Sequence, residues 1–337
     1  MNKILVTGSA GHLGEALMRT LRADGQEVIG TDIVPSLFTD MVGSISDRAH
    51  VHRCMAAVDA VLHTATLHKP HVATHSRQAF VDTNITGTLN LLEEATTAGV
   101  RAFVFTSTTS TFGDALTPAT GEPAAWITEE VVPIPKNIYG VTKVAAENLC
   151  ELFHRNQQLP CLILRTARFF PEPDDSRATR DTYHDANVKA NEYLYRRVDL
   201  ADVVSAHRCA VARAATIGFG RYVISATTPF TPADLAELHR DAPSVVHRLF
   251  PTYAELYAEQ GWRMLPTIDR VYVNAQARRE LDWRPQVDFA HILTLLANGQ
   301  SDLRSSLARA VGIKGYHGQH FADGLYPVAQ GAASPRQ

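Results

Sequence analysis

Two residues with acid–base chemistry, Tyr139 and Lys143, stand four positions apart in the chain. On a helix this spacing places both side chains on one face. Upstream, the segment 105–113 contains six consecutive Ser and Thr residues. A free phenol has a pKa of about 10, and two nearby cations, one of them the lysine ammonium, that lowered it by about 3 units would contribute about 4 kcal/mol. The pattern therefore indicates a base that takes a carbinol proton and a hydroxyl that holds the carbinol oxygen.

A glycine-rich turn, residues 8–14 (GSAGHLG), follows the apolar run 3–7. A helical pattern then begins at Leu13, and a second strand, 27–31, ends at Asp32. Small residues let the backbone approach a pyrophosphate at the positive end of a helix. The carboxylate would accept hydrogen bonds from the adenosine ribose and repel a 2′-phosphate, which predicts NAD rather than NADP. The positive nicotinamide ring would add to the effect of the lysine on the phenol.

Strands and helices alternate through the first half of the chain, and the apolar strand runs suit a sheet that is buried on both faces. We expect strands at 59–63, 101–106 and 160–165, and helices at 76–98 and 138–154, the second capped by Asn137. This order predicts an α/β Rossmann fold, a doubly wound parallel sheet whose ligands lie at the carboxyl ends of the strands.

The alternation ends after residue 169, where a turn-rich acidic segment begins. We expect residues 1–169 to form an NAD-binding domain, to which residues 198–230 return through the segments 198–206 and 222–225. Residues 170–197 and 231–315 are expected to form a smaller, mostly helical C-terminal substrate lobe. We expect residues 316–337 to be a mobile tail.

The composition is that of an ordinary globular protein, with 337 residues, 45% hydrophobic content and a net charge of −3. No basic block indicates nucleic acid, no apolar run could span a bilayer, and the first strand leaves no room for a signal peptide. The four cysteines lack metal or redox spacing, which predicts reduced thiols in the cytoplasm. We therefore expect a small-molecule substrate.

The chain resembles the extended short-chain dehydrogenases/reductases of the NAD-dependent epimerase/dehydratase superfamily over most of its length. The resemblance implies NAD as cofactor and a homodimer through the two long helices, whose apolar positions equally suit packing on the sheet. It rests on Thr7–Gly14, Val61–Ala65, Asn84–Thr88, the hydroxyl cluster, Tyr139 with Lys143, Val198–Val204 and Ala277–Pro285.

By this resemblance Tyr139 is the base, Lys143 lowers its pKa and holds the nicotinamide ribose, Thr108 supplies the catalytic hydroxyl, and Asn84 orders the active-site helix. The implied cofactor contacts are Gly8, Gly11, His12, Leu13, Gly14, Asp32, Ser44, Ile45, His63, Ala65, Tyr139, Lys143 and Thr166. The expected substrate contacts are His68, Thr108, Thr109, Arg168 and Arg177.

Three functions remain open: a net dehydrogenase of a small polyol, sugar or sugar acid, a nucleotide-sugar epimerase, and a non-catalytic NAD(H)-sensing protein. The complete catalytic set argues against the sensor, which needs no base. The two residues after Thr108 are not the acids that a 4,6-dehydratase needs. The short segment between Phe170 and Val198 favours a small substrate over a nucleotide sugar.

The segment 171–177 (PEPDDSR) is similar to the corresponding segment of uronate dehydrogenases, in which an arginine at this spacing holds the sugar carboxylate. The resemblance implies that Arg177 is a carboxylate clamp. The alternative is a solvated arginine beside Asp174 and Asp175. Thr109 and Ser110 stand where uronate dehydrogenases have Asn-His, so uronate itself is not predicted.

Three histidines, His68, His71 and His75, stand close together after the strand 59–63. Two of them could share a helix face, but no local carboxylate or cysteine completes a metal coordination sphere, so no metal is predicted. We expect the loop to line the substrate pocket through His68 or Lys69; the alternative is a polar surface loop.

Overall fold

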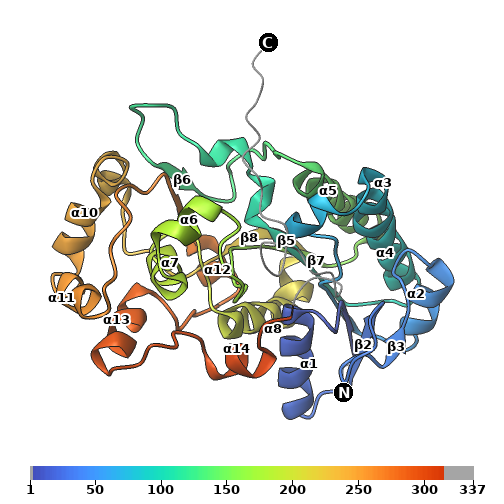
Figure 1. Cartoon of the computed structure of the whole chain (residues 1–337). Coiled ribbons are helices and arrows are strands. Elements are labelled where there is room, and N and C mark those ends of the chain that lie inside the picture. Colours follow the sequence, from blue (N-terminus) through green and yellow to red (C-terminus); the bar gives the residue numbers. More distant parts are fainter. Residues whose placement is uncertain (1–2, 315–337) are drawn as a thin grey trace.

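The computed structural model describes residues 3–314 of the chain. Within them, seven parallel strands form one sheet in the order β3-β2-β1-β4-β5-β7-β8 (Figure 1). The strands are β1 (Ile4–Thr7), β2 (Val28–Asp32), β3 (Met41–Val42), β4 (Ala60–His63), β5 (Ala102–Thr108), β7 (Cys161–Thr166) and β8 (Phe219–Ile224). The strand order reverses beside β1, and the crevice at such a point is where doubly wound sheets bind ligands. The predicted fold class is confirmed.

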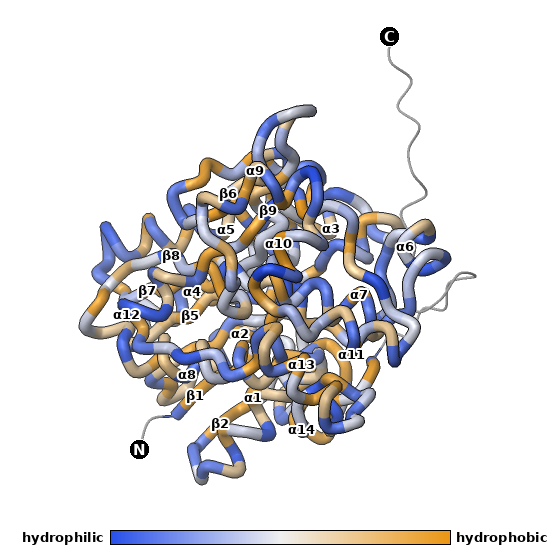
Figure 2. The backbone as a smooth tube through the Cα atoms, turned by 90° about the vertical axis from the view of Figure 1, so that its left-hand side faces the viewer, coloured by the Kyte–Doolittle hydropathy of each residue, from blue (hydrophilic) through white to orange (hydrophobic). Residues whose placement is uncertain are grey.

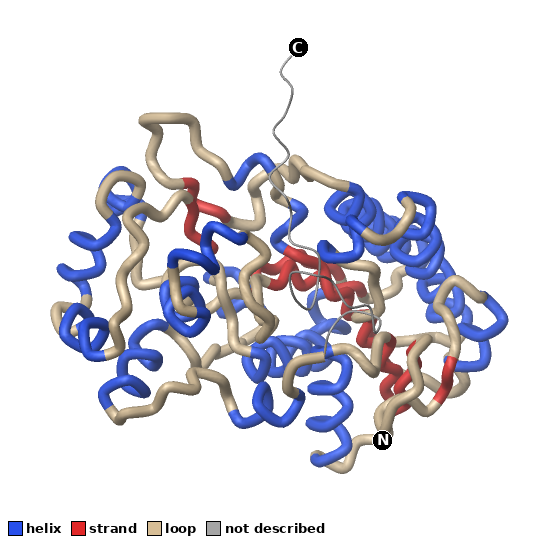
Figure 3. Tube along the Cα trace, in the orientation of Figure 1, coloured by secondary structure: helices blue, strands red, loops and turns tan. Residues whose placement is uncertain are grey.

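Helices cover both faces of this sheet, which crosses the molecule between them (Figure 3). One layer contains α1 (His12–Ala23), α8 (Leu200–Ile217) and α14 (Ser306–Val311), and the other contains α2 (Arg48–Cys54), α3 (Arg77–Phe80), α4 (Gly87–Thr97) and α5 (Ile138–Gln157).

Successive strand residues point into opposite cores. In β1, Ile4 and Val6 join the cluster that includes α1 and α8, while Leu5 joins the cluster on the side of α2, α4 and α5. All three side chains are buried. This alternation between two apolar layers explains why the strands appear in the sequence as uninterrupted hydrophobic runs, and β1 and β5 are hydrophobic along the tube in Figure 2.

A smaller lobe packs beside the sheet and has its own apolar cluster. A two-stranded parallel ribbon, β6 (Ala125–Ile127) with β9 (Arg270–Tyr272), lies at its edge. Its helices are α6 (Arg177–Thr182), α7 (Asp185–Glu192), α9 (Leu235–Leu238), α10 (Ala242–Leu249), α11 (Tyr253–Glu259) and α13 (Phe289–Ala297). Helix α12 (Ala275–Glu280) packs on β8, and its Ala277 belongs to an apolar cluster of the main sheet.

Two local expectations need correction. The segment 198–206 does not enter the sheet as a strand, because the Asp199 side chain caps α8 by accepting the Ala201 N–H at 2.7 Å. The chain returns to the sheet through β8, which includes the expected 222–224. The helix expected at 76–98 contains a π-helical stretch, Val81–Thr86, between α3 and α4.

The remaining expectations concern termini, membranes and thiols. The tail 316–337 lies outside the described residues. None of the helices that the structure describes is long and apolar enough to cross a membrane. Cys54, Cys150, Cys161 and Cys209 carry free thiols.

Asp202, in the first turn of α8, connects the sheet to the smaller lobe. Its two carboxylate oxygens accept the backbone N–H groups of Gln286 and Val287 at 2.8 and 2.9 Å. Trp283, which is fully buried, donates its indole N–H to the Asp202 carbonyl at 3.1 Å. Burial raises the pKa of Asp202 to about 6, against the two backbone hydrogen bonds.

We predict that Asp202→Ala lowers the free energy of unfolding by about 2–4 kcal/mol, because two buried N–H groups lose their acceptor. The raised pKa makes ionisation unfavourable in the fold, so the stability that Asp202 contributes falls as pH rises through about 6. Urea unfolding should therefore show a larger deficit at pH 5 than at pH 7.5. Asp181→Ala, at an exposed side chain on α6, is the control; equal effects of the two changes would contradict the prediction.

Candidate active site

The turn between β1 and α1 can contain only small residues at two positions. Gly8 has φ of +72°, and a Cβ there would lie 2.8 Å from the Ala65 nitrogen. A Cβ at Gly14 would lie 1.9 Å from the Gly8 carbonyl oxygen. At the glycines no side chain covers the backbone N–H groups at the start of α1, and a helix N-terminus of this kind binds a pyrophosphate well.

Asp32 ends β2 beside this turn. Its Oδ2 accepts the Ala10 N–H at 3.0 Å and its Oδ1 accepts the Val34 N–H at 2.9 Å. These bonds fix the carboxylate but leave acceptor positions on both oxygens, because an ionised carboxylate has about four. The turn and the carboxylate together have the chemistry that a dinucleotide requires, one part for its pyrophosphate and the other for its ribose.

One cavity of about 970 Å³ joins this turn to the hydroxyl cluster at the end of β5. It brings together most of the residues expected from the sequence. The expected cofactor residues that line it are Gly8, Gly11, His12, Leu13, Gly14, Asp32, Ser44, Ile45, Ala65, Tyr139 and Thr166; the expected substrate residues are His68, Thr108, Thr109 and Arg168.

Tyr139 and Thr108 meet across this cavity wall. Thr108 is the last residue of β5, and Tyr139 lies in the first turn of α5, where the Asn137 side chain caps the helix by accepting the Gly140 N–H at 3.1 Å. Both residues line the cavity. Burial raises the pKa of Tyr139 to about 12, and the nearby Thr108 side chain opposes this shift. In the chain alone the phenol therefore remains protonated at neutral pH.

Lys143 lies one turn further along α5 and is 2% exposed. Its ammonium donates to the Thr106 carbonyl at 2.7 Å and lies 3.9 Å from the centre of the Phe105 ring. Burial lowers the pKa of Lys143 to about 7, against the charge of Glu147. In the chain alone, burial is the largest influence on the pKa of both Tyr139 and Lys143; the predicted combined effect of Lys143 and a nicotinamide ring on the phenol stays a prediction.

A buried ionic network behind Lys143 was not anticipated. Glu147, a further turn along α5, accepts hydrogen bonds from Ser107 at 2.5 Å and from two nitrogens of Arg165, the closest at 2.7 Å. All three residues are at most 3% exposed. The four-residue spacing that joins Tyr139 to Lys143 continues to Glu147, and this was the available signal in the sequence.

Asn84 lies behind the cavity in the π-helical stretch. Its amide nitrogen donates to the Leu67 carbonyl at 2.9 Å and to the Thr142 hydroxyl at 3.0 Å, and its amide oxygen accepts the Leu67 N–H at 2.9 Å. It thus ties the loop after β4 to α5 one residue before Lys143. This geometry suits the expected ordering of the active-site helix.

Four expected site residues do not line this cavity: Lys143 and Asn84, whose contacts are given above, and His63 and Arg177. His63 is 1% exposed, and its ring nitrogens lie 2.9 Å from the hydroxyls of Thr7 and Thr88, so its side chain belongs to the core between β4 and α4. Arg177 begins α6 with a side chain that is 76% exposed and 3.5 Å from Asp181. Of the two alternatives, a carboxylate clamp and a solvated arginine, this position agrees with the second, because the short helix α6 buries none of its residues.

The histidine-rich loop contributes His68, Lys69, Pro70 and His71 to the cavity wall. The His68 ring stacks on Phe170 with centroids 5.4 Å apart. Across residues 3–314, no group of three or more His, Cys, Asp or Glu side chains is arranged to hold a metal ion. The loop is therefore part of the cavity wall rather than a free surface loop.

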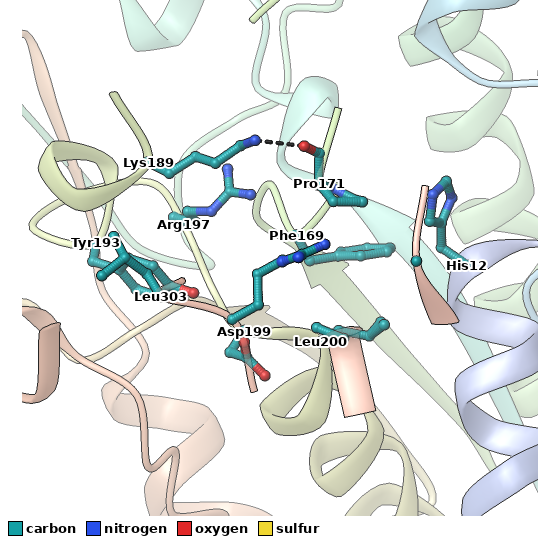
Figure 4. Close-up of a pocket in the computed structure, with 12 residues that line it drawn as sticks. His12, Phe169, Pro171, Lys189, Tyr193, Arg197, Asp199, Leu200 and Leu303 are labelled. Carbon is teal, nitrogen blue, oxygen red and sulfur yellow. Dashed lines mark hydrogen bonds between the residues drawn. The ribbon is translucent and has the colours of Figure 1, made fainter. Parts of the chain in front are cut away.

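A buried pair connects the glycine turn to the loop after β7. His12 Nε2 lies 2.8 Å from Glu172 Oε1, and both side chains are at most 5% exposed. A second, small cavity of about 30 Å³ lies beside this loop. Figure 4 shows its lining residues, with His12 on one side and Lys189 and Arg197 on the other. Lys189 also donates to the Pro171 carbonyl. The loop is thus fixed from both sides by polar contacts.

A model of the NAD dependent epimerase/dehydratase family matches residues 4–224. A UDP-glucose 4-epimerase of Rhizobium meliloti is 31% identical over 173 residues, which is 49% of this chain and 51% of that protein. A 3-beta-hydroxysteroid dehydrogenase of Mycolicibacterium neoaurum is 31% identical over 157 residues, 44% of this chain and 42% of that protein. The chain thus spans about half the length of these curated relatives.

A crystal structure of a short-chain dehydrogenase/reductase superfamily protein from Agrobacterium tumefaciens with bound NAD has the same fold. Its TM-score is 0.63 at 22% identity, and the match covers 88% of this chain and 96% of that one.

We predict that Asp32→Ala weakens NAD binding by about 10- to 100-fold, because the change removes the carboxylate that we expect to accept hydrogen bonds from the ribose. Titration with NADH fluorescence measures the affinity. Asp32→Asn keeps an acceptor but removes the charge, so it should also narrow the preference for NAD over NADP. Asp24→Ala, at an exposed carboxylate beyond α1, is the control. An unaltered NAD affinity in Asp32→Ala would count against the ribose contact.

We predict that Lys143→Met raises the free energy of unfolding by about 0.5–2 kcal/mol at pH 7. The pKa of Lys143 lies below its ordinary value in the fold, so the unfolded chain binds the proton more tightly and the charge destabilises the fold. The gain should shrink as pH rises from 7 towards 10. Lys3→Met, at a partly exposed lysine, should show no such pH dependence. A less stable Lys143→Met would mean that the contacts to Thr106 and Phe105 outweigh the cost of burial.

Proposed function

The chain belongs to the NAD dependent epimerase/dehydratase family, and from this premise we propose that it transfers a hydride between NAD and a carbinol carbon of a small sugar, sugar acid or polyol-like substrate. The observation that carries the proposal is that Tyr139 and Thr108 both lie on the wall of the cavity that begins at the glycine turn, with the Thr108 side chain close enough to shift the pKa of the phenol. A phenol on the wall of this cavity could exchange a proton with a bound substrate, whereas a tyrosine that only packs in the core could not.

The chain's own residues have distinct roles in this proposal. Bound NAD would supply the hydride acceptor. The Thr108 hydroxyl would donate a hydrogen bond to the substrate oxygen, and Tyr139 would take the hydroxyl proton from the same oxygen. Lys143, held by the Thr106 carbonyl, would place a positive charge below the phenol. Glu147 favours the charged form of this lysine.

The high pKa of Tyr139 in the chain alone supports the proposed roles of two positive charges, those of Lys143 and of the oxidised nicotinamide. A pKa of about 12 would leave too little phenolate for oxidation at neutral pH. The positive charges that could lower it are the ammonium of Lys143 and the oxidised nicotinamide. Proton removal would thus depend on the presence of the oxidised cofactor. In the opposite direction, the protonated phenol is the form required to donate to a carbonyl oxygen.

A nucleotide-sugar epimerase is the second candidate. The UDP-glucose 4-epimerase named among the relatives favours it. Both reactions need the same base and hydroxyl, so the catalytic set supports either. They differ in whether the hydride leaves with the cofactor or returns to the substrate. A non-catalytic NAD(H) sensor has the least support, because it has no use for the buried hydroxyl pair.

A substrate screen separates the two candidates. Aldoses, uronic acids, polyols and nucleotide sugars are incubated with the protein and NAD, absorbance of the reduced cofactor is followed, and products are identified by NMR. Accumulation of NADH with a free sugar supports the dehydrogenase. Isomerisation of a nucleotide sugar without net NADH supports the epimerase.

We predict that Tyr139→Phe lowers turnover of the substrate found in this screen by at least about 100-fold, because no group remains to take the proton. NAD affinity should stay within about twofold of the wild-type value, since the change removes one oxygen. Tyr253→Phe, a buried tyrosine of the smaller lobe, is the matched control. Wild-type turnover in Tyr139→Phe would remove the proposed base.

A further inference from the structure

Three arginines from separate segments line one end of the large cavity. Arg168 follows β7, Arg196 precedes α8, and Arg270 begins β9. Backbone hydrogen bonds join these segments side by side: the Arg168 N–H donates to the Arg196 carbonyl at 3.3 Å, and the Tyr272 N–H donates to the Tyr195 carbonyl at 2.9 Å. The fold therefore places three cationic side chains next to one another.

The carboxylates that pair with these arginines lie at different depths. The two deepest carboxylates that pair with Arg168 and Arg196 are Asp174, at 2.7 Å from Arg168, and Glu192, at 2.9 Å from Arg196. The side chains of Asp174 and Glu192 are 6% and 1% exposed, whereas those of Arg168 and Arg196 are 32% and 23% exposed. Asp174 and Glu192 are thus more deeply buried than the guanidinium groups, while a third carboxylate, Asp175, lines the cavity 3.7 Å from Arg168.

The guanidinium groups retain unused hydrogen-bonding capacity. Within residues 3–314, the side chain of Arg168 donates one hydrogen bond that meets geometric criteria, from Nη1 to Asp174. Arg270 binds Asp269 through Nε and Nη2 at 2.8 and 2.6 Å. A guanidinium has five N–H donors, so both arginines have donors available for a ligand.

Each of these arginines lies near another cation as well as near its carboxylate partners. Arg196 repels both Arg168 and Arg270. Although burial opposes ionisation, the surrounding arginine charges hold the pKa of Glu192 at about 2. Lys69 and Lys136 also line the cavity, and so do the carboxylates of Asp32, Glu172 and Asp175, the last of which pairs with Lys69 and with Arg168. An anion placed here would relieve the mutual repulsion of the arginines.

From this arrangement we infer that Arg168, Arg196 and Arg270 bind an acidic group carried by the sugar itself, a carboxylate or a phosphate monoester. The inference rests on the proposed function, because it names the substrate class of the same cavity. Planar guanidinium groups pair with both anions through two parallel hydrogen bonds. The acid would be held by these three arginines rather than by the exposed Arg177.

Binding to the NAD-loaded protein tests this inference. Isothermal titration compares D-glucuronate and D-galacturonate, D-glucose 6-phosphate and D-galactose 6-phosphate, the neutral sugars D-glucose and D-galactose, and UDP-glucose. We expect at least one acidic sugar to bind at least about tenfold more tightly than its neutral counterpart, as one charge-assisted hydrogen bond allows. Preference for the carboxylates or for the phosphates identifies which acid the site accepts.

The variants Arg270→Gln and Arg168→Gln should each lower affinity for the preferred acidic sugar by about 10- to 100-fold and leave affinity for the neutral sugar within about twofold. Arg270→Lys keeps the charge without the two-pronged geometry and should recover part of the loss. The matched control is Arg248→Gln. Arg248 lies on α10, outside the cavity, and it also pairs with two carboxylates. NAD affinity checks that each variant is folded.

Three results would overturn the inference: acidic sugars that bind no better than neutral ones, an advantage of the acid that survives in both glutamine variants, or tight binding of UDP-glucose alone. In each case NAD binding and the effect of Tyr139→Phe on turnover would be unaffected. A failure of this inference is thus distinguishable from a failure of the proposed hydride transfer.

Discussion

The parallel direction of the sheet strands is the constraint on which the site depends. Because every strand of the main sheet runs the same way, all carboxyl ends meet at one edge. Gly8 follows β1, Asp32 ends β2, Thr108 ends β5 and Arg168 follows β7. Residues separated by as many as 160 positions therefore line one cavity. Their side chains need only be polar at the strand end and apolar within the strand.

Helix α5 adds the groups that the strand ends lack, and it does so at a cost in stability. Tyr139, Lys143 and Glu147 occupy successive turns of one buried face. Burial disfavours the charged forms of both the phenol and the ammonium. Glu147, held by Arg165 and Ser107, offsets part of that penalty for the lysine. The arrangement keeps two reactive groups out of water at the expense of a buried ionic network.

Local patterns were sufficient to predict the fold and most of the cavity lining, because the glycine turn, the strand-end hydroxyls and the helix with Tyr139 each lie within one short segment. Positions that depend on packing between distant segments were not predictable. His63 has a polar side chain at a strand end but faces the core. Arg177 matched a spacing, yet α6 turns it to solvent. Arg196 and Arg270 become neighbours only through a contact between segments far apart in the chain, in which the Tyr272 N–H donates to the Tyr195 carbonyl.

The π-helical stretch Val81–Thr86 changes the rotational phase between the helices on either side of it. A π turn contains one residue more than an α turn, and each residue advances a helix by about 100°. Phe80, just before the stretch, packs with Leu67 and Tyr139, whereas Leu91, after it, packs against the sheet. Because of the added residue, the part of this helical segment before the stretch and the part after it face different neighbours. Substitutions that suit the contact with Tyr139 therefore need not disturb the contact with the sheet, and the two parts can vary independently in sequence.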